Sequence, residues 1–165
     1  MAGGTVRVLA IDPGAKTGIA LFDAEDQKAH LKIIEGGLEG FKEWFYDVKG
    51  ANQLAGSHLD AIIVESFELE EGSHGIDYES PTQIIHWIKE GGLSVNYFNP
   101  IVWQRRMQRG KNTTASVAVL KRAGLYPKRG ELKEGHQVAA LQHALSYLIR
   151  VRHKPTIELL HPKEG

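Results

Sequence analysis

VRVLAIDPGAKTGIALF, residues 6–22, contains two apolar runs that are separated by a turn. The runs 6–11 and 18–22 have the length and apolar character of buried strands, and Asp12-Pro13-Gly14 between them is a turn signal. We therefore predict a β-hairpin with Asp12 at its bend. An ionised carboxylate at the end of a buried strand is costly in free energy unless a cation or hydrogen-bond donors compensate its charge. Asp12 is thus the first candidate site residue.

Strands and helices alternate after this hairpin. A third strand is expected at 30–34, and residues 38–48 have apolar side chains at helical spacing. The next expected elements are a short buried strand at 61–64 that ends in Glu65, a loop at 66–79, a helix that starts at Ser80-Pro81, a strand at 93–98, and helices at about 113–122 and 134–151. The order βββαβαβαα predicts an α/β fold with a mixed five-stranded sheet flanked by helices.

The length and composition are those of one globular domain. The chain has 165 residues, of which 42% are hydrophobic and 24% charged. We expect the domain to cover residues 1–152, and residues 153–165, which show no clear hydrophobic period, to form a C-terminal tail. The absence of cysteine excludes disulfides and thiolate metal sites. Because no apolar run of about 18 residues and no leader peptide is found, we expect a cytoplasmic protein without a membrane partner.

Charged side chains are unevenly distributed along a chain whose formal net charge is zero. Residues 1–100 carry 7 basic and 16 acidic side chains, residues 101–133 carry 9 and 1, and residues 134–165 carry 4 and 3. Acidic groups that hold a cation, together with a concentrated basic segment, are typical of a metal-dependent enzyme that acts on a polyphosphate. A solvated basic helix is the alternative interpretation of the segment 101–133.

Asp12 and Glu65 form a candidate metal site with His136. If the strands that precede Asp12 and Glu65 are neighbours, both carboxylates meet at one edge of the sheet. His136 begins the last predicted helix, from which an imidazole can enter the same space. Oxygen ligands with one nitrogen suit Mg²⁺, and Mn²⁺ as its substitute. A turn-forming role for Asp12 and a partly exposed helix-start position for His136 are the structural alternatives.

Four segments occur in an order and at a spacing that resemble the RuvC family of Holliday-junction resolvases: Ile11-Asp12-Pro13-Gly14, Gly18-Ile19-Ala20, Val64-Glu65 and the segment 136–143, HQVAALQH. The likeness is greatest to the phage branch, in which the last helix tends to read His-x-x-Asp-Ala-x-x-His. It covers about residues 6–150. The resemblance implies a ribonuclease-H-like fold, a homodimer, and cleavage of branched DNA with a divalent metal ion.

The resemblance assigns roles to three residues and exposes one departure. Asp12 corresponds to the first-strand aspartate, Glu65 to the fourth-strand glutamate, and His136 to the histidine or aspartate that opens the last helix. These residues are therefore expected to be catalytic and to bind the metal. Ala139 occupies the position of a metal-binding aspartate. Two divalent ions bring about four positive charges, whereas Asp12, Glu65 and one phosphate supply only about three negative ones. Either the aspartate was replaced to inactivate the protein, which we favour, or the alanine is a natural variant that weakens metal binding.

Residues of the basic segment are the candidates for DNA contacts. Arg105, Arg106, Arg109 and Lys111 are its densest part, and such side chains pair with phosphates and supply affinity and register. Phe67 resembles the aromatic residue that lies near the opened junction in bacterial family members. Trp103 is either a core residue or a stacking platform for a base. The apolar residues Ile84, Ile85, Trp87 and Ile88 either form a dimer interface or cover the sheet.

Three alternative functions share this pattern. A phosphotransferase of the actin and sugar-kinase class would need a second domain to enclose its nucleotide, so no nucleotide cofactor is expected. A catalytically silent junction-binding module would account for a natural Ala139. A related nuclease of the same fold would prefer flaps or forks, and phosphate contacts cannot distinguish these substrates from four-way junctions.

Overall fold

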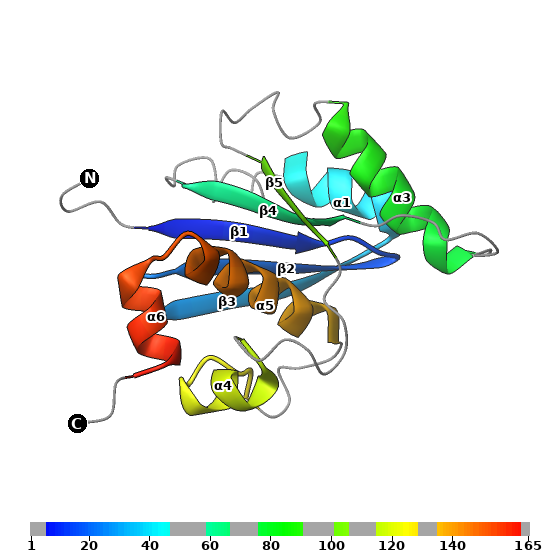
Figure 1. The fold of residues 1–165 in the computed structure, drawn as a ribbon. Helices are drawn as coiled ribbons and strands as arrows, with labels where there is room; N and C mark the ends of the chain where they lie inside the picture. The colour runs from blue at the N-terminus through cyan, green and yellow to red at the C-terminus, as the bar shows by residue number, and fades with distance from the viewer. Residues whose placement is uncertain are drawn as a thin grey trace.

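Residues 7–23 form a hairpin within a five-stranded mixed sheet in the computed structural model of the chain (Figure 1). The structure describes residues 6–46, 59–66, 76–90, 101–105, 115–128 and 135–162. The strands are β1 (Arg7–Asp12), β2 (Lys16–Asp23), β3 (Lys28–Glu35), β4 (Ala61–Ser66) and β5 (Ile101–Arg105). Their order in the sheet is β3-β2-β1-β4-β5. β2 pairs antiparallel with β1 and β3, whereas β4 pairs parallel with β1 and β5, so the predicted mixed sheet is confirmed.

Helices cover both faces of the sheet (Figure 1). α1 (Gly37–Tyr46) and α3 (Ile76–Lys89) pack on one face. α4 (Val117–Arg122), α5 (Gly135–Arg150) and α6 (Lys154–Leu160) pack on the other. α5 contacts β1, β2, β3 and β4 and therefore crosses the centre of its face. The result is the three-layer α/β arrangement that the element order predicts.

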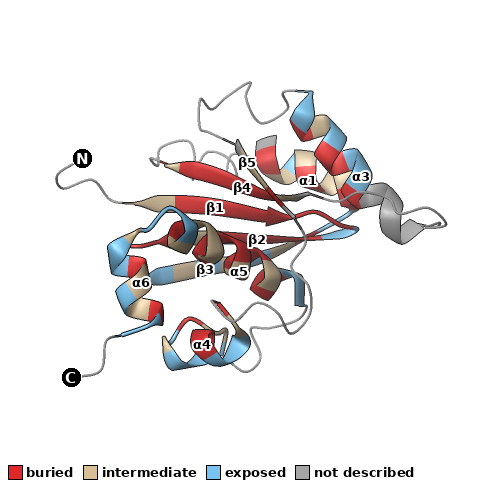
Figure 2. Ribbon diagram, in the orientation of Figure 1, coloured by how far each residue is buried: buried red, intermediate tan, exposed pale blue. Residues whose placement is uncertain are grey.

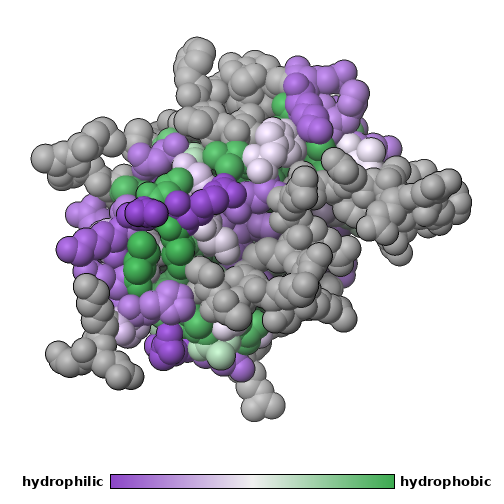
Figure 3. Space-filling model, in the orientation of Figure 1, coloured by the Kyte–Doolittle hydropathy of each residue, from purple (hydrophilic) through white to green (hydrophobic). Residues whose placement is uncertain are grey.

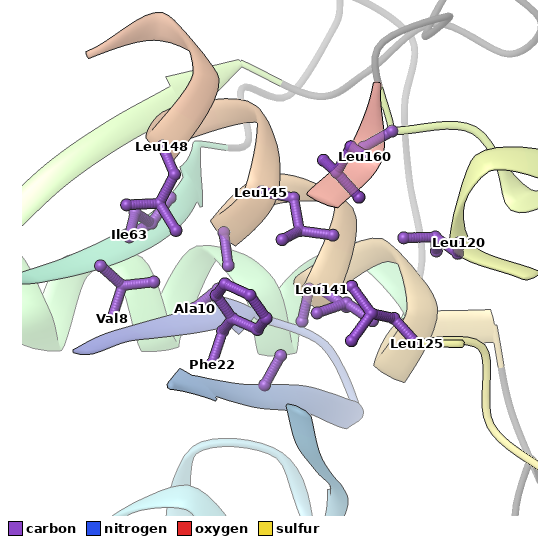
Figure 4. Packing of buried hydrophobic residues seen from close by; sticks show 14 of the residues in the cluster. Val8, Ala10, Phe22, Ile63, Leu120, Leu125, Leu141, Leu145, Leu148 and Leu160 are labelled. Carbon is purple, nitrogen blue, oxygen red and sulfur yellow. The ribbon is translucent and has the colours of Figure 1, made fainter. Parts of the chain in front are cut away.

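Side chains of the central strands alternate between the two hydrophobic cores, as the pleat of a strand requires. Along β1, Val8 and Ala10 pack on the α5 side, whereas Leu9 and Ile11 pack on the side of α1 and α3. The strand is buried almost throughout (Figure 2). Figure 4 shows the α5-side core, in which the labelled residues are Val8, Ala10, Phe22, Ile63, Leu120, Leu125, Leu141, Leu145, Leu148 and Leu160. Asp12 is two residues after Ala10 and four after Val8, so its side chain lies on the same face of the strand, toward α5.

The C-terminal segment differs from the irregular tail expected at 153–165, because residues 154–160 form helix α6. Pro155 lies in its first turn, where the missing N–H of proline breaks no helical hydrogen bond. Leu160 is fully buried in the α5-side core, and its carbonyl accepts a hydrogen bond from Arg122 Nη2 at 2.6 Å. A helix of seven residues is too short to show a clear hydrophobic period, so the sequence pattern missed it.

Two further elements start elsewhere than expected. α3 begins at Ile76, which places Pro81 inside the helix and makes residues 76–79 of the expected loop helical. β5 occupies Ile101–Arg105, at the start of the basic segment, whereas the strand expected at 93–98 lies outside the described residues. Turn-type dipeptides locate an element boundary only approximately, because pairing and packing with the rest of the fold decide where the element runs.

The apolar face of α3 covers the sheet. Ile84, Ile85 and Ile88 are buried within the chain, and Ile84 and Ile88 belong to the core between α3 and the strands. Trp87 is half-buried, with its ring centroid 5.7 Å from that of Phe41 and 6.0 Å from that of Phe45. The burial of the three isoleucines within the chain favours the interpretation in which this face packs on the core, and the dimer interface stays an untested prediction.

The α5 side of the molecule also shows a small apolar area on its surface. In Figure 3, hydrophobic side chains lie next to strongly hydrophilic ones over α6 and the adjoining end of α5, and Val151 between these helices is 51% exposed. Apolar surface of this extent is ordinary for a folded domain. None of the described helices is both long and apolar enough to span a membrane.

Candidate active site

Asp12 and Glu65 come together because β1 and β4 are parallel neighbours. Ile11 is paired with Val64 in the register, so the next residues of the two strands, Asp12 and Glu65, lie side by side. Both follow the alternation that places Ala10 and Ile63 on the α5 side. Their side chains are each 12% exposed. The two strand-end carboxylates therefore meet at one edge of the sheet, as the sequence predicts.

His136 joins this pair from the first turn of α5. Its Nδ1 atom lies 3.1 Å from Asp12 Oδ2, and its side chain is 45% exposed. Gly18 of β2 makes this approach possible, because a Cβ atom at this position would lie 2.1 Å from the carbonyl oxygen of His136. Any larger residue would push the start of α5 away from the strands. The glycine of the Gly18-Ile19-Ala20 segment is thus required to seat the helix over Asp12.

The carboxylates are held in an electrostatically unfavourable environment. Burial, as the largest effect, raises the pKa of Asp12 from 3.8 to about 6. The neighbouring Glu65 carboxyl group raises this pKa further through a hydrogen bond and charge repulsion, whereas His136 opposes the rise. A cation placed between the two carboxylates would favour their ionised forms. A carboxyl group whose pKa is raised in this way, next to other titratable side chains, is typical of functional sites.

His143 is a fourth member of the cluster that sequence reasoning did not select as a site residue. Its side chain is 2% exposed, and Nε2 lies 3.3 Å from Glu65 Oε2. The signal was present in the sequence, because His143 closes the segment HQVAALQH and follows His136 by seven residues, which is two helical turns. Its proximity to Glu65 could not be predicted, since it depends on how α5 crosses the sheet.

Some of the other predicted site residues lie in the part of the chain that the structure describes, and some lie outside it. Ala139 lies on α5 one turn after His136 and is half-buried. Arg105 is the last residue of β5 and pairs in register with Ser66, at the same edge of the sheet as Glu65. Trp103 packs on the opposite side, with Lys89 Nζ 5.2 Å from its ring centroid, which favours the core role. Phe67, Arg106, Arg109 and Lys111 lie outside the described residues.

The donor set suits a hard divalent cation, although the described residues do not form a complete cage. Two adjacent carboxylates and an imidazole are ligands that Mg²⁺ and Mn²⁺ accept. No group of three or more histidine, aspartate and glutamate side chains in the described part of the chain is arranged to hold a metal ion. Asp12 and Glu65 would therefore bind a cation only together with ligands from water or substrate, as Mg²⁺ sites commonly do.

Comparisons with known proteins identify the fold. No protein-family model matches the chain, and no curated protein sequence matches it significantly. Among solved structures, T. thermophilus RuvC in complex with a Holliday junction substrate matches with a TM-score of 0.58 and 18% identity over 89% of this chain and 96% of that one. The fowlpox virus Holliday junction resolvase matches with a TM-score of 0.52 and 14% identity over 88% and 99% of the two chains.

The fowlpox virus resolvase in complex with its substrate Holliday junction DNA also matches, with a TM-score of 0.54 and 16% identity over 89% of this chain and 99% of that one. The matches span nearly the full length of each known structure. The chain therefore shares the fold of these Holliday junction resolvases, as the resemblance in sequence implied. At this level of identity the likeness defines the fold and leaves the activity to be argued from the site.

Proposed function

We propose that the chain is a Holliday-junction resolvase, a metal-dependent endonuclease that hydrolyses phosphodiester bonds of four-way and other branched DNA. The observation that carries this proposal is the pair of buried carboxylates, Asp12 and Glu65, at one edge of a resolvase-type sheet. The raised pKa of Asp12 supports it, because a protein gains nothing in stability from two adjacent buried acids that no cation neutralises.

Asp12 and Glu65 would hold Mg²⁺, with Mn²⁺ as a substitute. When bound, a divalent cation supplies charge stabilisation for the attacking water and for the leaving oxygen of the phosphodiester. The 3.1 Å contact between His136 Nδ1 and Asp12 Oδ2 fixes the orientation of the Asp12 carboxylate. Since the His136 side chain is nearly half exposed, its ring can also face a ligand or the attacking water. The chain therefore contributes carboxylates in fixed positions and an imidazole at the mouth of the site.

Ala139 leaves the proposed metal site short of one carboxylate ligand. Its methyl group supplies no ligand, although it lies one helical turn from His136 on the helix that borders the site. An aspartate at this position would add the third carboxylate that the charge balance of two divalent cations requires. A chain with natural Ala139 that binds junctions without cutting them is the second candidate function, and it is favoured by the same residue.

The DNA partner is proposed from the basic residues that follow β5. Arg105 ends β5 at the edge that carries Glu65, and Arg106, Arg109 and Lys111 follow it in the sequence. Phe67 likewise follows Ser66, the last residue of β4. We propose that the basic residues bind phosphates near the scissile bond and that Phe67 contacts the bases of the opened junction. A resolvase must cut two strands at a branch point, so the proposal includes a two-fold homodimer.

The proposal is tested by binding and cleavage of labelled DNA of three shapes. The parent chain and its Ala139→Asp variant are titrated with a four-way junction, a flap and a linear duplex of the same sequence, with Mg²⁺, with Mn²⁺ and with chelator. We expect both proteins to prefer the junction and the variant to cut it in Mg²⁺ or Mn²⁺. Preferential binding and cleavage of the flap would make the chain a flap nuclease. Equal affinity for all three shapes would overturn the proposal.

A further inference from the structure

His143 is a buried imidazole whose position is explained neither by hydrophobic packing nor by a direct role in the proposed site. Its side chain is 2% exposed, and it lies on α5 among residues that fill the α5-side core, such as Ala144 and Leu145. Placing a polar ring in such a core costs about 1–3 kcal/mol for each nitrogen that lacks a hydrogen bond. Leucine or alanine would fill the position without that cost.

Glu65 is the acidic group next to this ring. His143 Nε2 and Glu65 Oε2 are 3.3 Å apart, although neither ring nitrogen of His143 meets the geometry of a hydrogen bond with any described residue. A small rotation of the Glu65 carboxylate would complete a hydrogen bond from Nε2–H to Oε2. The geometry thus places a donor within reach of one oxygen of the glutamate.

Gln104 fixes the part of α5 from which His143 projects. Gln104 is paired with Glu65 in the register of β4 and β5, so both side chains leave the sheet on the same side. Its Nε2 atom donates a hydrogen bond of 2.9 Å to the backbone carbonyl of His143, and the Gln104 side chain is buried. The strand that neighbours Glu65 therefore also holds the helix turn that carries His143.

We propose that His143 is a positioning residue that donates a hydrogen bond from Nε2 to Glu65 and thereby orients this carboxylate for a divalent cation. The inference rests on the proposed function, because it assumes that Glu65 is a metal ligand. Hydrogen-bond partners of metal-ligating carboxylates commonly raise metal affinity by about 10- to 100-fold. His136 orients Asp12 from one end of the helix segment and His143 orients Glu65 from the other.

Two substitutions at His143 separate this role from simple packing. His143→Leu removes the donor and keeps the core filled, whereas in His143→Gln the amide nitrogen is the same number of bonds from Cβ as Nε2 is. The same two substitutions at His86 are the matched control, since His86 Nε2 also contacts a glutamate, Glu90 Oε1 at 3.0 Å, but on the exposed surface of α3.

The first measurement is the affinity for Mn²⁺, followed by the electron paramagnetic resonance signal of free Mn²⁺, together with the melting temperature of each metal-free variant. We expect His143→Leu to weaken Mn²⁺ binding by about 10- to 100-fold and His143→Gln to stay within about threefold of the parent. Both His86 variants should bind as the parent does. Parent-like affinity of His143→Leu, or equal loss in His143→Leu and His143→Gln, would overturn the inference.

The second measurement uses ¹⁵N-labelled histidine in the metal-free protein and is independent of the proposed function. We expect the nuclear magnetic resonance spectrum to show a proton on Nε2 of His143 whose shift changes in Glu65→Ala. A ring without a proton on Nε2, or a resonance unaffected by Glu65→Ala, would overturn the inference. An Ala139→Asp protein that binds no Mn²⁺ would contradict the proposed function instead, and the nuclear magnetic resonance result would then decide the His143–Glu65 interaction alone.

Discussion

Asp12 Oδ2 and His136 Nδ1 lie 3.1 Å apart although the two residues are separated by 124 positions in the sequence. Two local features create this contact. β1 ends at Asp12 beside β4, and Gly18 of β2 lets the first turn of α5 descend onto the sheet. The candidate site is therefore built by the closest approach between a helix and the strands, and its geometry should respond to changes that alter this approach.

Gly18→Ala should disrupt the site without touching a site side chain. The added methyl group would lie 2.1 Å from the carbonyl oxygen of His136, so the start of α5 must move. We expect a loss of about 1–3 kcal/mol in the free energy of unfolding, measured by urea denaturation, and weaker Mn²⁺ binding. Gly135→Ala is the control, because a Cβ there meets nothing within 4 Å. Equal effects of the two substitutions would contradict the close-approach argument.

Asp12→Asn should change how stability depends on pH. Because burial and Glu65 raise the pKa of Asp12 from 3.8 to about 6, its contribution to stability is complete below pH 3.8 and is lost as the pH rises through about 6. This difference corresponds to about 3 kcal/mol. In chelator, we expect Asp12→Asn to be more stable than the parent above pH 6 and similar to it near pH 4. The exposed Asp26 provides the control Asp26→Asn, and parallel pH profiles of parent and Asp12→Asn would refute the prediction.

Arg7 and Asp23 form a partly buried ion pair at the far end of β1, with Arg7 Nη2 2.9 Å from Asp23 Oδ2. Burial alone would raise the pKa of Asp23, but hydrogen bonds from Arg7 and from the backbone of Asp26 outweigh it and hold this pKa below 3.8. The stabilisation is therefore present above pH 3.8 and is lost as the pH falls through the lowered value.

Arg7→Leu should consequently reduce the free energy of unfolding at pH 7 by about 1–3 kcal/mol, with a smaller effect at pH 3. Urea denaturation at the two pH values measures this difference. The exposed pair of Lys154 and Glu158, at 3.9 Å, supplies Lys154→Leu as a control that should change stability by less than about 1 kcal/mol. An Arg7→Leu effect of the same size at both pH values would show that the ion pair is not its cause.

Leu160→Ala tests whether α6 is part of the folded domain. Leu160 is fully buried in the α5-side core, so its truncation should cost about 2–5 kcal/mol in the free energy of unfolding. Val151→Ala, at a half-exposed position just before α6, should cost less than about 1 kcal/mol. If the Leu160→Ala variant were as stable as the parent, α6 would not be part of the folded domain.

The parts of the fold that could be predicted are those with strong local signals. The runs 6–11, 18–22 and 61–64 are apolar apart from Arg7, so the strands follow from the pattern. The meeting of Asp12 with Glu65 was predicted on the condition that their strands are neighbours, which the pairing of β1 with β4 fulfils. α5, of 16 residues, was predicted to within one residue at each end, because Val138, Leu141, Leu145 and Leu148 recur at helical spacing.

The parts that were missed depend on tertiary structure. α6 has seven residues and owes its burial to α5 and α4, which no local pattern records. In the sequence, His143 cannot be distinguished from the other core positions of α5. Only the packing of the helix on the sheet places its Nε2 atom 3.3 Å from Glu65 Oε2. The sequence shows Gly18 as part of a motif. The need for glycine at this position, which is the close approach of the His136 backbone, is visible only in the structure.

The most direct test of the central claim is single-turnover cleavage of a four-way junction by the Ala139→Asp variant with and without Glu65→Gln. We expect Ala139→Asp to cut the junction in Mg²⁺ on opposing strands, to leave linear duplex intact, and to stop cutting in chelator or when Glu65→Gln is added. Cleavage that survives Glu65→Gln would contradict the assignment of Asp12 and Glu65 as the metal site. Tight junction binding with no cleavage by any variant would show a binding module instead of a nuclease.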